Sequence, residues 1–238
     1  MVIPECPDRF VACLDILGFK KALECRGTVQ VAHSLASASY IVQILHGRDV
    51  KLSQQDARDF GPLLMHALKD LPFPGVQHLI SFSDSIILFT EDDRQESLVS
   101  LCEFSNLIFQ LFLLHKLPLR GAIAKGSAII NRDLDLYVGT AIVEAHLLEQ
   151  SLDLVGIVLH PTLQCDSASP ANITKKTGEQ QLMLVPRCRD SLKMPIRMDD
   201  LFHDVRCLAG PDHATRYANS EHVVAAMMNM DAEQFRPR

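Results

Sequence analysis

The segment Phe10-Val11-Ala12-Cys13-Leu14-Asp15-Ile16-Leu17-Gly18-Phe19 decides how the chain folds. An apolar run that ends at a glycine is typical of a β-strand covered on both faces and followed by a tight turn. Asp15 stands near the end of that strand, and a buried carboxylate costs free energy unless another group pairs with it. Asp15 is therefore either a cap for a helix that begins near Phe19 or a ligand of a metal ion.

A second segment, Ile80-Ser81-Phe82-Ser83-Asp84-Ser85-Ile86-Ile87-Leu88-Phe89, predicts two apolar strands joined at Ser83-Asp84. Aspartate tolerates turn geometry, so an ordinary hairpin turn explains Asp84 without any function. If the second of these strands lies antiparallel beside the first segment, the turn falls next to Asp15, one strand spacing of about 4.8 Å away. Two aspartates placed in this way would hold two divalent cations about 3.5–4 Å apart, the separation used for displacement at phosphorus.

Four segments, in this order, resemble the motifs of class III nucleotidyl cyclases. Asp15-Ile16-Leu17-Gly18-Phe19 resembles Asp-Ile-x-Gly-Phe, and Ser83-Asp84 matches the Gly-Asp hairpin of the family. The segment 119–126 resembles the strand Arg-x-Gly-Ile-x-x-Gly, and 139–149 resembles the next helix, Gly-x-Ala-Val-Asn-x-Ala-x-Arg-Leu-Glu. The likeness spans about residues 10–150, and it is strongest to the compact pyrimidine cyclases of bacterial Pycsar anti-phage systems.

The resemblance implies an α+β fold, an α/β sandwich with a ferredoxin-like cyclase core in which helices pack on an antiparallel-rich sheet. The sequence predicts strands at 10–16, 77–82, 85–90, 118–124, 134–137, 155–159 and 181–185, helices at 29–45, 53–71, 95–116, 140–150 and 221–229, and a polar loop at 161–178. We expect a single nucleotidyl cyclase domain over residues 1–238, with its core at about 8–160 and an extension at 161–238.

The resemblance also implies which residues bind cations and phosphates. Asp15 and Asp84 would bind two Mn²⁺ or Mg²⁺ ions, and the backbone carbonyl of Ile16 would complete one coordination shell, because these cations prefer oxygen ligands. The turn Leu17-Gly18-Phe19-Lys20 would offer backbone amides to the triphosphate at a helix N-terminus, where Gly18 permits a close approach.

Other candidate residues keep two interpretations each. Arg120 is either a phosphate or carboxylate clamp or a member of a surface ion pair. Tyr40 either lines the nucleotide pocket or belongs to the core. Lys193 or Arg197 would supply a late basic contact to the triphosphate, and His146 is expected to be an exposed helix residue.

The sequence departs from the family at four positions. Purine cyclases select their base partly through a lysine or glutamate where this chain has Ile80, and through a second position that is Leu136 here. The asparagine and arginine that assist the transition state are replaced by Val143 and Leu147. Either the base pocket is built differently or the activity has been lost.

Three functions follow from these matches and departures. The first is a pyrimidine nucleotide cyclase that acts on UTP, and less readily on CTP, because Ile80 and Leu136 leave the polar groups of a purine unpaired and an arginine suits the second carbonyl of uracil. The second is a purine nucleotide cyclase or another enzyme that uses a triphosphate and metals. The third is a catalytically inactive nucleotide-binding regulatory module.

The composition bounds the location and the partners. The chain has 238 residues, of which 47% are hydrophobic, and its net charge of −6 argues against nucleic acid as a partner. No apolar run reaches the roughly 18 residues of a membrane span, and the N-terminus lacks the pattern of a secretory signal. The seven cysteines have scattered spacing, which indicates free thiols in the cytoplasm. Because class III cyclases bind substrate between two domains, the single domain here predicts a homodimer with composite active sites.

Overall fold

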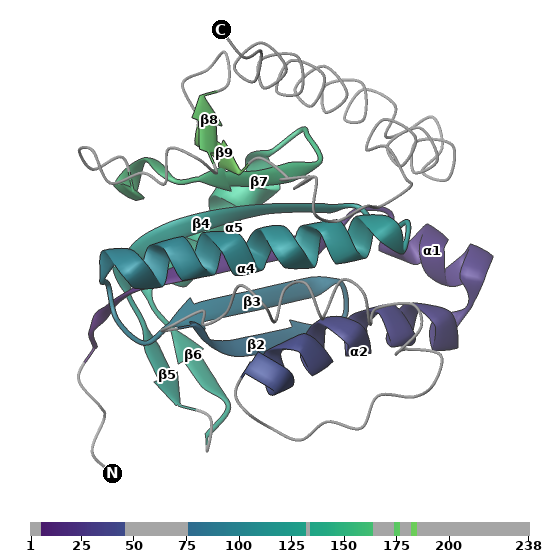
Figure 1. Ribbon diagram of the computed structural model, residues 1–238, viewed down its shortest axis with the longest axis horizontal. Coiled ribbons are helices and arrows are strands. Elements are labelled where there is room, and N and C mark those ends of the chain that lie inside the picture. Colours follow the sequence, from purple (N-terminus) through teal and green to yellow (C-terminus); the bar gives the residue numbers. More distant parts are fainter. Residues whose placement is uncertain (1–5, 46–75, 132–133, 164–173, 177–181, 185–238) are drawn as a thin grey trace, which may run out of the picture.

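The computed structural model describes residues 6–45, 76–131, 134–163, 174–176 and 182–184. These residues form a mixed α+β sandwich in which helices pack on a seven-stranded, mostly antiparallel sheet (Figure 1). The fold class predicted from the sequence is therefore confirmed.

The elements follow one another in nearly the predicted order. They are β1 (Asp8–Ile16), α1 (Phe19–Arg26), α2 (Thr28–Leu45), β2 (Val76–Phe82), β3 (Ser85–Thr90), α4 (Gln95–Leu114), β4 (Leu119–Ser127), β5 (Ile129–Asn131), β6 (Leu136–Val138), α5 (Thr140–Ser151), β7 (Gly156–Leu159), a 3-10 helix (Pro161–Leu163), β8 (Thr174–Lys176) and β9 (Leu182–Leu184).

Gly27, with a φ of +81°, separates α1 from α2, and a positive φ favours glycine. Two strands, β5 and β8, are absent from the sequence prediction. Strand β8 lies inside the segment 161–178 that was predicted to be a polar loop, and that part of the prediction is wrong. The helices predicted at 53–71 and 221–229 lie outside the described residues.

Strand β1 occupies the middle of the sheet, whose strand order is β2-β3-β1-β4-β7-β9-β8. It pairs antiparallel with β3 on one side and with β4 on the other, so that Asp15 stands opposite Ser85 and opposite Arg120. The amide of Ile16 donates a hydrogen bond of 3.0 Å to the carbonyl of Asp84. The predicted antiparallel arrangement is thus confirmed, and it brings the β2–β3 turn to the end of β1.

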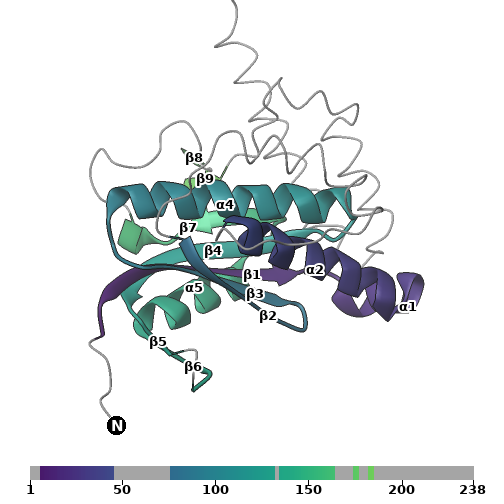
Figure 2. The same ribbon diagram turned by 60° about the horizontal axis from the view of Figure 1, so that its bottom comes forward.

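Alternate residues of β1 enter two separate cores. Phe10, Ala12, Leu14 and Ile16 lie in the larger core beneath α4, because successive side chains of a strand point to opposite faces. Val11 and Cys13 lie in the smaller core with Ala141 and Ala145 of α5. Figure 2 shows α4 and α5 on opposite faces of the sheet. By the same alternation, Asp15 faces the side of the sheet that α5 covers.

Helix α4 forms the centre of the larger core. Within the described residues, one stretch, Gln95–Leu113, has the length and composition of a membrane span, yet 76% of it is buried inside the fold. Its side chains Leu101, Phe104, Ile108 and Phe112 pack against the sheet. A helix buried in this way fits the core of the sandwich.

Close packing between β1 and β4 depends on Gly121. A Cβ atom at this position would lie 2.4 Å from Leu14 Cδ2 and 2.8 Å from the backbone carbonyl of Cys13. Because one of these neighbours is backbone of the paired strand, a side chain at 121 would force β1 and β4 apart.

We therefore expect Gly121→Ala to lower the free energy of unfolding by about 1–3 kcal/mol, the usual cost of overpacking. Urea unfolding followed by circular dichroism measures this. Val29→Ala, at a position on α2 that is 75% exposed, serves as the control and should change stability by less than about 0.5 kcal/mol. A Gly121→Ala protein as stable as the control would contradict the tight approach of the two strands.

Candidate active site

The two aspartates that the sequence predicted as metal ligands meet at one end of the sheet. Asp15 is the last but one residue of β1, and Asp84 lies in the turn between β2 and β3, hydrogen-bonded through its carbonyl to the next residue of β1. Ser83 takes a φ of +58° in this turn, a left-handed conformation that costs a non-glycine residue roughly 1–2 kcal/mol. The motif that Ser83-Asp84 resembles has glycine in place of Ser83, and a glycine would adopt this conformation without that cost.

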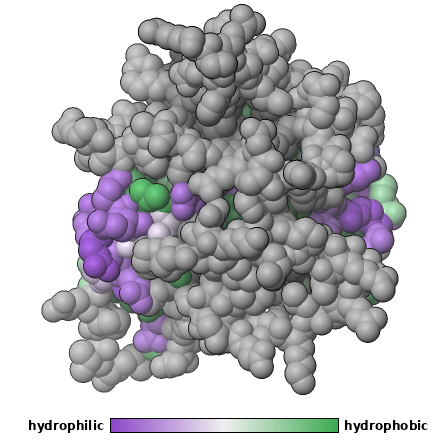
Figure 3. Space-filling model, viewed as in Figure 1, coloured by the Kyte–Doolittle hydropathy of each residue, from purple (hydrophilic) through white to green (hydrophobic). Residues whose placement is uncertain are grey.

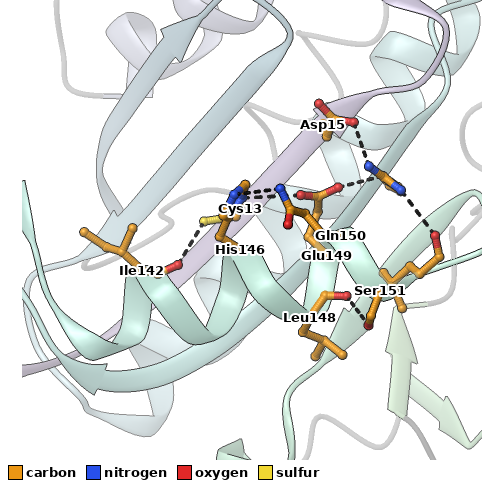
Figure 4. A network of polar contacts seen from close by, with 10 residues as sticks. Cys13, Asp15, Ile142, His146, Leu148, Glu149, Gln150 and Ser151 are labelled. Carbon is orange, nitrogen blue, oxygen red and sulfur yellow. Dashed lines mark hydrogen bonds and ion pairs between the residues drawn. The ribbon is translucent and has the colours of Figure 1, made fainter.

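Arg120 lies against two carboxylates. Its Nη2 atom is 3.4 Å from Oδ2 of Asp15, and its Nε atom is 2.6 Å from Oε1 of Glu149. Its Nη1 atom donates a hydrogen bond of 3.3 Å to the carbonyl of Leu152. In Figure 4, dashed lines join Asp15 from β1 and Glu149 from α5 to the same guanidinium. The Arg120 side chain is only 14% exposed, so it is a largely buried carboxylate clamp within the protein.

Glu149 is the site residue that sequence reasoning missed. Its side chain is 4% exposed, and it is the third buried residue of α5 after Ala141 and Ala145. Residues four apart lie on one face of a helix. The interval 141, 145, 149 was therefore the available signal, since a carboxylate that continues an apolar helix face needs a partner on the sheet.

The contact between Arg120 and Glu149 is mainly one of charge. Arg120 Nε and Glu149 Oε1 are close, but neither atom has a partner in hydrogen-bond geometry among the residues that the structure describes. The second carboxylate oxygen of Glu149, Oε2, lies 3.6 Å from Nδ1 of His146. His146 is exposed, as expected, and its Nε2 atom lies 3.0 Å from Gln150.

Negative charge exceeds positive charge at this end of the sheet. Burial raises the pKa of Glu149 to about 7, Arg120 opposes that shift, and the charges of Asp15 and Asp84 add to it. Burial likewise raises the pKa of Asp15; Arg120 again opposes the shift, and Asp84 adds to it. One guanidinium thus contacts two of three mutually repelling carboxylates, and a bound cation would relieve their repulsion.

The donor set suits a hard divalent cation. Asp15, Asp84 and the carbonyl of Ile16 offer oxygen atoms, which Mg²⁺ and Mn²⁺ prefer. Among the described residues, no three of the side chains His, Cys, Asp and Glu gather into a cluster of metal-ligand type. A cation here would therefore need oxygen atoms of a bound phosphate or water to fill its shell.

The predicted phosphate turn follows β1 directly. Gly18 has a φ of +70° and caps α1, while the amide of Leu17 is already hydrogen-bonded to the carbonyl of Pro118 at 2.9 Å. Phe19 and Lys20 occupy the first turn of α1, where backbone amides have no partner within the helix. Phe19 is half-buried against the larger core and Lys20 is exposed.

The remaining predicted positions lie apart from this group or outside the described part. Ile80 is half-buried in the smaller core with Ile87, on the same face of the sheet as Asp15. Leu136 on β6 is 42% exposed. Tyr40 belongs to α2, but its side chain is outside the described residues, and so are Lys193 and Arg197.

Solved structures with a similar arrangement include cyclases. A structure of a bacterial light-regulated adenylyl cyclase is 14% identical, with a TM-score of 0.48, and the match covers 88% of this chain and 59% of that chain. A second such structure is 12% identical, with a TM-score of 0.47 and coverage of 85% and 100%. The guanylyl cyclase Cya2 is 11% identical, with a TM-score of 0.44 and coverage of 79% and 96%.

No protein-family profile matches the sequence, and no curated protein matches it. This chain spans 59% of the length of the first of the adenylyl cyclase structures. The function is therefore argued from the site.

The charge excess predicts how stability varies with pH. Because the pKa of Glu149 in the folded state is about 7, above its ordinary value, the folded protein binds an extra proton between about pH 4.5 and pH 7. Its contribution to stability is full below that interval and is lost as the pH rises through it. Each unit of pKa shift corresponds to about 1.4 kcal/mol.

We expect the wild-type protein to lose on the order of 1–3 kcal/mol more stability between about pH 5 and pH 8 than Glu149→Gln, whose side chain cannot titrate. Urea unfolding at several pH values, in the presence of a chelator, measures the difference. Parallel pH profiles for the two proteins would contradict the raised pKa of Glu149.

Proposed function

We propose that this protein is a nucleotidyl cyclase that converts UTP, and less readily CTP, into the 3′,5′-cyclic mononucleotide and pyrophosphate. The observation that carries the proposal is the pairing of β1 with β3, which brings Asp15 beside the Asp84 turn. Gly18 and the N-terminus of α1 at Phe19 follow within four residues of Asp15. Carboxylates beside a phosphate-binding turn are the parts that metal-assisted phosphoryl transfer requires.

The reaction needs no nucleophilic side chain. The 3′-hydroxyl of the substrate attacks its own α-phosphate and gives up its proton to solvent, a bond forms between O3′ and the α-phosphorus, and the bond to pyrophosphate breaks. Two divalent cations, when bound, lower the pKa of that hydroxyl and neutralise charge on the phosphates. Asp15, Asp84 and the Ile16 carbonyl are the ligands that we assign to them, and Arg120 lies beside Asp15 on the neighbouring strand.

The triphosphate would lie against the turn that opens α1. The amides of Phe19 and Lys20 point outward from the first turn of the helix, where the helix dipole favours an anion. Lys20 and Lys21 are both exposed, so positive charge is available at this end. Figure 3 shows hydrophilic side chains at the right-hand edge, where α1 lies in Figure 1.

A pyrimidine substrate suits the apolar character of the selecting position. Ile80 lies on the same face of the sheet as Asp15 and offers no hydrogen-bond partner to a purine, whose unpaired polar atoms would cost about 1–3 kcal/mol each. The nitrogens of Arg120 contact Asp15, Glu149 and Leu152. We therefore assign Arg120 to these partners within the protein and propose Tyr40 as the donor for the second carbonyl of uracil.

We also propose a cytoplasmic homodimer with composite active sites. Large apolar side chains are exposed on β6 and on α5, namely Leu136, Val138, Val143 and Leu147. They lie on consecutive elements, and a second copy would remove them from water. The cysteines in the described residues are free thiols, which suits a reducing compartment. A second-messenger role in bacterial anti-phage defence is proposed from the sequence resemblance alone.

A nucleotide-binding module without activity is the second candidate function. Val143 and Leu147 occupy the positions of the asparagine and arginine that assist the transition state in class III cyclases, and they are 53% and 56% exposed. These two apolar residues supply no hydrogen bond to a phosphate. Incubation with labelled nucleoside triphosphates separates the two candidates, because only the enzyme forms a product.

Asp15→Ala and Asp84→Ala should each abolish turnover while the fold survives. Each change removes a cation ligand, and the lost stabilisation of transition-state charge is worth several kcal/mol, or more than about a hundredfold in rate. Product formation with Mn²⁺ and the melting temperature are measured together. The control is Asp93→Ala, since Asp93 is exposed and pairs with Lys125 at 2.8 Å, and it should keep wild-type activity. Wild-type rates in either site variant would refute the cation assignment.

Incubation with each of the four labelled ribonucleoside triphosphates and Mn²⁺ should give a cyclic mononucleotide and pyrophosphate from a pyrimidine. We expect the rate with UTP to exceed the rates with ATP and GTP at least about tenfold, which corresponds to about 1.4 kcal/mol in the barrier. Equal or faster turnover of ATP would refute the base assignment. Binding of a nucleotide without any product would support the inactive module.

A further inference from the structure

We propose that Glu149 is a positioning residue that holds the guanidinium of Arg120 away from Asp15, so that the Asp15 oxygens remain available to a divalent cation. This inference rests on the proposed function, because it concerns the cation site at Asp15 and Asp84. It assigns Glu149 an action through Arg120 and no contact with the substrate.

The distances show which carboxylate holds the arginine. Arg120 Nε lies 2.6 Å from Glu149 in an ion pair, whereas Nη2 donates a hydrogen bond of 3.4 Å to Asp15. Charge-assisted hydrogen bonds from a guanidinium to a carboxylate are usually about 2.7–2.9 Å long, so the bond to Asp15 is a long one. Arg120 therefore makes its closer charge contact with Glu149 and its weaker one with Asp15.

Helix α5 supplies two of the three groups that locate the guanidinium. Glu149 lies in the last turn of α5, and the carbonyl of Leu152, the C-cap, accepts the hydrogen bond from Nη1. The C-terminal end of a helix attracts a positive charge. Because Ala141 and Ala145 pack this helix face against the sheet, the position of Glu149 is fixed relative to β1.

Removal of the Glu149 charge would redirect Arg120. A largely buried guanidinium without a counterion is costly, and Asp15 is the other carboxylate that it contacts. Arg120 would move toward Asp15, form a closer ion pair and compete with a cation for Oδ2. The charge on Glu149, in α5, thus keeps the carboxylate oxygens of Asp15, in β1, available to a cation.

A double-mutant cycle on Mn²⁺ binding tests this without any substrate. Free Mn²⁺ is measured by electron paramagnetic resonance at about pH 8, where a carboxyl group with a pKa near 7 is ionised. Glu149→Gln should weaken binding about tenfold in the wild-type background and less than about twofold in an Arg120→Gln background, because coupled residues are not additive. If the charge of Glu149 acted directly on the cation, Glu149→Gln would weaken Mn²⁺ binding by the same factor in both backgrounds, and that result would overturn the proposal.

Two further variants complete the test. Glu149→Asp keeps the charge but withdraws it by one methylene, and it should weaken Mn²⁺ binding about threefold; binding equal to wild type would overturn the proposal even if Glu149→Gln does not fold. Glu144→Gln is the matched control on the same helix, since Glu144 pairs with His160 at 3.4 Å, and it should bind as wild type.

The outcome for Asp15→Ala separates this inference from the proposed function. If wild-type Mn²⁺ binding is lost in Asp15→Ala but is unaffected by Glu149→Gln, only the role of Glu149 is refuted. If Asp15→Ala binds Mn²⁺ as tightly as wild type, the cation site itself is refuted, and the role of Glu149 with it.

Discussion

The pairing of β1 between β3 and β4 is the constraint on which the rest of the site depends. A strand in the middle of a sheet is apolar on both faces where it is covered, and β1 is apolar from Phe10 to Leu14, after which Asp15 appears. The antiparallel register then leaves no freedom in what surrounds that carboxylate. Ser85 and the Asp84 turn stand on one side, and Arg120 stands on the other.

Electrostatics at this end of the sheet opposes stability and favours ligand binding. Two carboxylates contact one arginine, the charge of Asp84 acts on both, and burial raises the pKa of both Asp15 and Glu149. A fold selected for stability alone would place a neutral side chain here, because buried charges in excess cost free energy. This excess of negative charge would favour the binding of a cation, since the repulsion that destabilises the free protein would be relieved on binding.

Local patterns predicted the elements and the meeting of Asp15 with Asp84. The apolar runs and the glycine turn defined β1, β2 and β3, and a single assumption about pairing placed the two aspartates together. Glu149 was not predicted, because its partner lies on another element and only the packing of α5 on the sheet brings it to Arg120. The predictions for Tyr40, Lys193 and Arg197 remain predictions.

Anomalous scattering from manganese tests the central claim most directly. Crystals grown with Mn²⁺ and a non-reactive analogue of UTP should show two anomalous peaks about 3.5–4 Å apart between the carboxylates of Asp15 and Asp84. The triphosphate should lie against the turn at Gly18. Peaks elsewhere on the protein, or a bound nucleotide with no metal between the two aspartates, would contradict the assignment of this site.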